Sequence, residues 1–131
     1  MMTLDLRSRK PVEMIDITAQ VRDAVRKSGV RSGLALVFTP HTTAAVTINE
    51  NADPDVVADL CMEINKIVPF DDHYRHAEGN SAAHLKSSLF GASETLIVED
   101  GAPVLGTWQG IYFCEFDGPR SRRLHIQVIG A

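Results

Sequence analysis

A nearly continuous apolar run at residues 33–39, GLALVFT, places the strongest constraint on what this chain can fold into. The run contains β-branched and aromatic residues and is bounded by Gly33 and Pro40, so it is too short for a buried helix and predicts a strand. Consecutive apolar residues are typical of a strand that is covered on both faces. We therefore expect a strand here with neither face open to solvent.

The rest of the chain carries alternating strand and helix signals. Helices are predicted to begin at the N-caps Thr18, Asp53 and Ser81 and to end at Gly29, Pro69 and Gly91. Further strands are predicted at residues 4–6, 12–16, 44–49, 95–98, 111–116 and 122–129. We expect the first two to form a hairpin and residues 44–49 to return beside 33–39. The pattern predicts a single α+β domain over residues 1–131, with mixed or antiparallel sheets of about seven or eight strands and three helices.

Composition narrows the possible partners and location. The 131 residues match the size of one domain, and no apolar run is long enough to cross a membrane. The net charge of −4 argues against a general nucleic-acid binder, which is normally basic. The N-terminus lacks a signal peptide, so a cytoplasmic location is expected. Cys61 and Cys114 lack CxxC spacing and are interpreted as reduced, buried residues.

Three histidines are candidate metal ligands. His76 and His84 flank a Gly-Asn turn and the first turn of a predicted helix, which lets a short segment bring them together. His41 lies in a strand-connecting turn beside Thr42. Catalytic zinc commonly has three protein ligands and an open fourth position. No HExxH or HxxxH motif is present, so the spacing leaves a metal site and ordinary structural histidines both open.

The second group of candidates is charged. Arg120 follows a Gly-Pro turn that would hold its guanidinium in place to bind phosphate, and Arg122 and Arg123 point to opposite faces of their strand. The alternative is a surface pair of Arg120 with Glu115 or Asp117. Glu115 lies among apolar residues and therefore needs a partner, either an arginine or a metal.

Further candidates lie elsewhere in the chain. Asn80 and Ser81 precede a helix whose free amides favour an anion. Glu50 ends an apolar strand just before another helix, and Trp108 and Gln109 offer a ring to stack a heterocycle and an amide to orient it. Trp108 as a core residue is the competing interpretation.

Three segments together resemble the signature blocks of a known family. TPHTTAAVTINENADPDV, HAEGNSAAHLKSSLFG and LGTWQGIYFCEFDGPRSRR occur in the order found in the YjbQ-like, or secondary thiamine-phosphate synthase, family. The similarity covers nearly the whole chain, with least signal in the first thirty or so residues. It implies one YjbQ-like α+β domain with mixed sheets and a homotrimer.

The resemblance also implies an activity and a set of site residues. The implied reaction joins a pyrimidine diphosphate to a thiazole phosphate, forms thiamine phosphate and releases pyrophosphate. By motif position, the histidine cluster linked to a divalent metal is His41, His76 and His84. Zinc or a similar ion suits imidazole ligands, and magnesium is the alternative. The catalytic candidates are Glu50, Glu115 and Arg120, and the substrate-binding candidates are Thr42, Asn80, Ser81, Trp108, Gln109, Asp117 and Arg120.

Two other functions remain open. The first is a metal-dependent hydrolase or lyase of a small phosphorylated or carboxylated metabolite, with Glu50 or Glu115 as base. The second is a non-enzymatic ligand-binding trimer. A different result is expected for each of the three functions. The transferase would form product from the two thiamine precursors, and the hydrolase or lyase would show chelator-sensitive turnover of another substrate. The ligand-binding trimer would retain a ligand without turnover.

Overall fold

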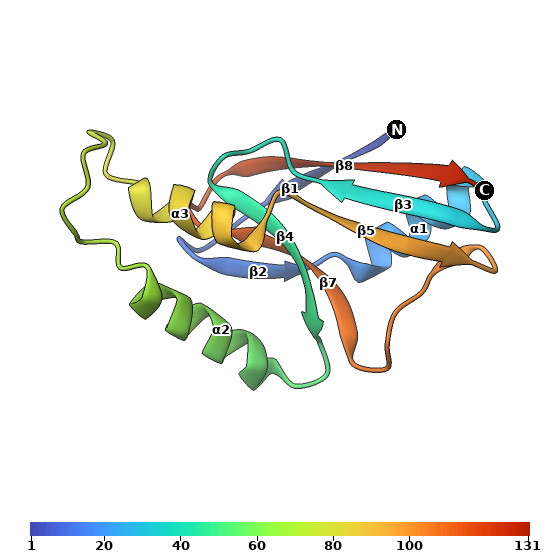
Figure 1. Cartoon of the computed structure of the whole chain (residues 1–131), viewed down its shortest axis with the longest axis horizontal. Helices are drawn as coiled ribbons and strands as arrows, with labels where there is room; N and C mark the ends of the chain where they lie inside the picture. Colours follow the sequence, from blue (N-terminus) through green and yellow to red (C-terminus); the bar gives the residue numbers. More distant parts are fainter.

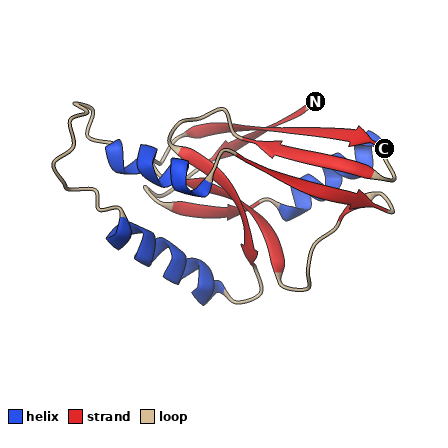
Figure 2. Ribbon diagram, in the orientation of Figure 1, coloured by secondary structure: helices blue, strands red, loops and turns tan.

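The computed structural model describes all residues from 1 to 131 and contains eight strands and three helices in one domain. The strands are β1 (Met2–Arg7), β2 (Glu13–Asp16), β3 (Gly33–Phe38), β4 (Ala44–Glu50), β5 (Ser93–Glu99), β6 (Ala102–Pro103), β7 (Gln109–Glu115) and β8 (Ser121–Gly130). The helices are α1 (Thr18–Ser28), α2 (Pro54–Ile67) and α3 (Ser81–Phe90). The α+β prediction is confirmed (Figures 1 and 2).

The strands form two antiparallel sheets. Sheet A has the order β1-β8-β3-β5-β6, and sheet B has the order β2-β7-β4. Two expected pairings are wrong: β1 and β2 belong to different sheets instead of forming a hairpin, and β4 pairs with β7 instead of returning beside β3. The connection from β1 to β2 and the connection from β3 to β4 each cross from sheet A to sheet B, and a local sequence pattern does not reveal such a crossing. No parallel pairing of a mixed sheet occurs.

The main core lies between the sheets and α1. Val21 and Val25 of α1 pack with Val37 of β3, Phe113 of β7 and Leu124 of β8, and all five are fully buried. The opposite face of sheet B is covered by α3, where Ala45, Tyr112 and Cys114 form one buried cluster with Ala83. Sheet B is therefore a middle layer, and its central strand β7 is buried along both faces from Gly110 to Glu115. No helix in the protein combines the length and the apolar character that a membrane crossing requires.

The expectation of a doubly covered strand at residues 33–39 is wrong for the single chain. Burial alternates along β3: Ala35 and Val37 face the core, whereas Leu34, Leu36 and Phe38 are 49%, 39% and 39% exposed. Ile97 and Ile129 of the neighbouring strands are exposed as well, because odd and even positions of a strand point to opposite faces. The outer face of sheet A is therefore apolar and uncovered.

Local signals at the helix ends were partly correct. Asp53 caps α2 by accepting a hydrogen bond from the backbone N–H of Asp55 at 2.9 Å, as predicted. Thr18 and Ser81 are the first helical residues instead of the caps, which are Ile17 and Asn80. The Thr18 hydroxyl donates to Asp16 and accepts from the backbone N–H of Ile111 in β7, so it bonds to the neighbouring strand and does not cap α1.

Candidate active site

A buried ion pair joins the two sheets. Arg122 of β8 donates from Nε to Glu115 Oε1 at 2.8 Å and from Nη2 to Glu115 Oε2, and both side chains are almost completely buried. The same Nη2 donates to the hydroxyl of Thr43 at 2.8 Å. Ser8 donates to Glu115 Oε1 at 2.6 Å, and the backbone N–H of Asp117 donates to Oε2 at 3.0 Å. Glu115 does have an arginine partner, and that partner is Arg122.

The hydrogen bonds keep Glu115 ionised. Burial would raise the pKa of Glu115, but the hydrogen bonds from Arg122 and Ser8 outweigh burial and hold its pKa below the ordinary value. Both carboxylate oxygens are occupied, and Glu115 lines none of the surface hollows described below. In this arrangement Glu115 positions other residues, and work as a base would require it to leave Arg122.

His41 lies in the turn after β3, two residues before Thr43. Its Nε2 accepts a hydrogen bond from the backbone N–H of Arg123 at 2.9 Å. Burial lowers the pKa of His41 below 6.5, and the charge of Arg122 adds to that effect. The neutral ring therefore carries its proton on Nδ1. With Nε2 used as an acceptor, His41 can bind a metal only if this hydrogen bond breaks.

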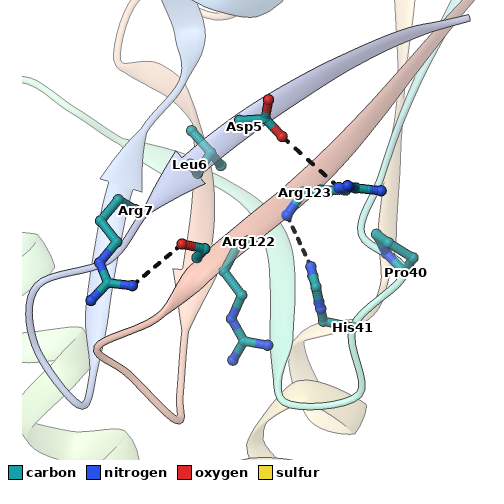
Figure 3. Close-up of a pocket in the computed structure, with 8 residues that line it drawn as sticks. Asp5, Leu6, Arg7, Pro40, His41, Arg122 and Arg123 are labelled. Carbon is teal, nitrogen blue, oxygen red and sulfur yellow. Dashed lines mark hydrogen bonds and ion pairs between the residues drawn. The ribbon is translucent and has the colours of Figure 1, made fainter.

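A surface hollow of about 760 Å³ opens beside His41. We call it the His41 hollow; Asp5, Leu6, Arg7, Pro40, His41, Ser121, Arg122 and Arg123 line it. Figure 3 shows His41 directed at the backbone of Arg123, with Arg7 and Asp5 extending from β1. Arg7 Nη1 donates to Ser121 Oγ at 3.3 Å, and Arg123 Nε lies 3.9 Å from Asp5 Oδ1. Three guanidiniums and one carboxylate thus surround the opening.

Sequence reasoning missed Arg7 and placed the cationic side of the site on Arg120. Arg120 forms an ion pair with Asp117, Nη2 to Oδ2 at 2.9 Å, which is one of the two surface pairs considered for it, and its role in a site stays a prediction. Asp117 Oδ2 also accepts from Asn80 Nδ2 at 2.9 Å, while Asn80 Oδ1 is buried without a partner. The register of β1 against β8 brings Arg7 opposite Ser121. The sequence signal available was the alternation of Asp5 and Arg7 on the exposed face of the first strand.

The three predicted metal ligands line two hollows that share His84. The rings of His76 and His84 are perpendicular, with centroids 5.6 Å apart, and with Tyr74, Ser81 and Leu85 they line one hollow. His84 and His41 line another, beside Thr42 and Ser87. Within the chain, no three His, Cys, Asp or Glu side chains are grouped so that they could hold a metal ion. His76 and His84 are the two predicted ligands whose rings are in contact, and the metal stays a prediction.

The remaining predicted residues lie at the far end of sheet B. Ala44 of β4 is opposite Glu115, whereas Glu50, the last residue of that strand, is opposite Gln109. The seven residues of β4 span about 20 Å. Trp108 is 62% exposed, not in the core, and lies at the Glu50 end with Gln109. One chain therefore separates Glu50, Trp108 and Gln109 from the histidines.

The buried pair leads to a stability prediction. The pKa of Glu115 is lower in the folded than in the unfolded chain, so its carboxylate stabilises the fold above about pH 4.5, and this contribution disappears as pH falls through the folded pKa. Glu115→Gln leaves Arg122 charged and unpaired, and should cost about 3–5 kcal/mol at neutral pH. Urea unfolding at fixed protein concentration should show the penalty shrinking below pH 4.5.

Glu63→Gln, on the exposed face of α2, is the matched control and should change the free energy of unfolding by less than about 0.5 kcal/mol. A Glu115→Gln penalty that is independent of pH would contradict the assignment of Glu115 as an ionised partner of Arg122.

Comparisons with known proteins identify the family of this chain. Residues 2–131 match the family model described as UPF0047 protein YjbQ-like. The chain is 54% identical over 129 residues to the UPF0047 protein YugU of Bacillus subtilis, covering 98% of both chains. It is 49% identical over 125 residues to a UPF0047 protein of Methanocaldococcus jannaschii, covering 95% of this chain and 91% of that one.

Solved structures agree with the sequence comparison. A YjbQ/UPF0047 family protein of Clostridium acetobutylicum superposes with a TM-score of 0.97 at 51% identity, covering 98% of this chain and all of that one. A YjbQ-like protein of Sulfolobus solfataricus gives a TM-score of 0.95 at 32% identity, covering 98% of this chain and 95% of that one. Sequence and fold agree over nearly the full length, and the chain belongs to the YjbQ-like UPF0047 family.

Proposed function

We propose that the protein is an enzyme that binds the anionic group of a small phosphorylated substrate in the His41 hollow. The observation that supports this is that a neutral imidazole and several arginines line the same opening. Arg122 is already neutralised by Glu115, which leaves Arg7 and Arg123 to bind the anion. Guanidinium forms two parallel hydrogen bonds with a phosphate, and the Nδ1–H of His41 is a third donor.

The reaction to test first is the thiamine-phosphate synthase type of substitution. The thiazole nitrogen donates its lone pair to the methylene carbon of the pyrimidine, and the carbon–oxygen bond to pyrophosphate breaks with its electron pair leaving on oxygen. No proton is removed in this step, so it needs no general base, and the buried position of Glu115 is compatible with it. Arg7, Arg123 and His41 would stabilise the charge that develops on the departing pyrophosphate.

A metal-dependent hydrolase or lyase is the second candidate function, and the contact of His76 with His84 favours it. Those two residues would hold a divalent ion, which supplies Lewis-acid charge when bound. Ser81, which lines the same hollow, would orient a substrate.

We also propose that the active form is a homotrimer. The uncovered apolar residues Leu34, Leu36, Phe38, Ile97 and Ile129 on sheet A supply a contact surface of the kind that subunits bury. A closed ring uses two different surfaces of each chain, so it can bring the Glu50 end of one subunit to the His41 end of the next. This would reunite the residues that one chain separates.

The transferase proposal predicts a specific loss of activity. Wild-type protein should release pyrophosphate and form thiamine phosphate from the two precursors. Arg7→Gln should lower kcat/KM by about 10–100-fold, because it removes a charged hydrogen bond to the anion. Arg9→Gln, an exposed arginine outside the His41 hollow, is the control and should keep full activity. Coupled pyrophosphate detection and chromatography of the product measure both.

Absence of pyrophosphate release by the wild type would contradict the transferase. Hydrolysis of phosphate esters that chelation abolishes and His84→Ala removes would then establish the second candidate. Retention of a phosphorylated ligand without any turnover would show that the protein is not an enzyme.

The trimer proposal predicts a molar mass three times that of the 14.4 kDa chain in light scattering after size exclusion. Leu36→Lys places a charge in the apolar face and should dissociate the protein, whereas Gln20→Lys on exposed α1 should not. If the site is shared, mixing and reassembling inactive Glu50→Gln and His41→Ala subunits should restore part of the activity. A monomeric wild type would contradict the trimer.

A further inference from the structure

A second group of arginines lies at the other end of β3 from His41. A hollow of about 570 Å³ opens between α1, the connection from α1 to β3 and the turn from β5 to β6. We call it the Arg22 hollow; Ala19, Arg22, Asp23, Arg26, Arg31, Asp100, Gly101 and Ala102 line it. In Figure 1 this end of the molecule carries α1 and the C-terminus, opposite the connection from β3 to β4.

The arginines of this hollow come from α1 and from the connection that follows it. Arg22 and Arg26 are four residues apart on α1 and share a helix face. Arg31 accepts a hydrogen bond on its carbonyl oxygen from the backbone N–H of Gly101 at 3.0 Å, which ties the two connections together. Its side chain lies across that turn: a Cβ on Gly101 would meet Arg31 Nη1 at 3.0 Å and Cζ at 3.6 Å. A bare glycine backbone thus leaves room for the Arg31 guanidinium.

Two of the three positive charges are unpaired. Arg26 forms an ion pair with Asp23, whose other oxygen binds Lys27 Nζ at 2.8 Å. The side chains of Arg22 and Arg31 make no hydrogen bond or close ion pair within the chain, and Asp100 pairs with neither. Asp16 acts on Arg22 only through longer-range charge attraction. Burial would raise the pKa of Asp16, but its hydrogen bonds, helped by this attraction, hold that pKa below its ordinary value. The hollow therefore has more free positive than negative charge, although the chain as a whole carries −4.

We infer that the Arg22 hollow is a binding site for a phosphate group, separate from the His41 hollow. Two guanidiniums without an ion-pair partner that line one opening provide the paired N–H donors that suit a phosphate dianion, whereas the charge of Arg26 is balanced by Asp23. The volume exceeds that of a bare phosphate and leaves room for a small organic group, so the ligand is a phosphate monoester or inorganic phosphate. The six residues of β3, which span about 17 Å, separate this site from the turn that carries His41.

The test follows backbone amides during titration with inorganic phosphate and, separately, glycerol 3-phosphate, at constant ionic strength with chloride as the balancing anion. TROSY NMR of the full-length protein resolves Arg31, Gly101 and Ala102 from Arg123 in the His41 hollow. Wild type should show saturable shifts at the first three residues. Arg22→Gln and Arg31→Gln should each weaken that binding at least about tenfold, and Arg9→Gln should leave it unchanged.

The two anions separate the sources of the ligand. Tighter binding of inorganic phosphate would identify free phosphate as the ligand, tighter binding of the ester would identify a phosphate monoester, and equal affinities would show that the site contacts the phosphate group alone. Shifts at Gly101 and Ala102 that do not saturate, that chloride reproduces, or that survive in Arg22→Gln/Arg31→Gln would overturn the inference. Each amide reports on its own surroundings, so a shift at Arg123 can be observed even if Gly101 and Ala102 show none. Failure of this inference is therefore distinguishable from failure of the proposed function.

Discussion

The buried pair of Arg122 and Glu115 is the interaction on which the architecture depends. It joins β8 of sheet A to β7, the central strand of sheet B, and four further hydrogen bonds link the pair to Ser8, Thr43 and Asp117. Removing two charges from water costs several kcal/mol per ion, so such a pair persists only when its geometry satisfies both partners. Its position explains why distant segments meet here: Ser8, Thr43 and Asp117 each lie in a connection between strands.

The pair also accounts for the state of His41. Thr43 accepts a hydrogen bond from Arg122, and His41 Nε2 accepts one from the backbone N–H of Arg123, so two consecutive residues of β8 fix the turn that carries His41. Burial and the adjacent guanidinium keep the ring neutral with its proton on Nδ1. A neutral donor beside two arginines suits an anion, whereas metal ligation at the same ring would require the hydrogen bond to Arg123 to break.

The sequence predicted what depends on local contacts. The Asp53-Pro54 start of α2 and the contact of His76 with His84 follow from neighbouring residues, and both are found. The strand at residues 33–39 was located correctly, but its uncovered face was not foreseen, because apolar residues look the same whether a helix or a second subunit covers them. Arg7 was missed because only the register of β1 on β8 places it beside His41. Arg122 was recognised as facing away from Arg123, yet its partner depended on how the two sheets stack.

The state of His41 can be measured directly by ¹⁵N NMR of the histidine side chains as a function of pH. His41 should have the tautomer with the proton on Nδ1 and a pKa below 6.5. A proton on Nε2 in the neutral ring, or a pKa above 6.5, would show that β8 does not hold His41 as described and would contradict the proposed anion site.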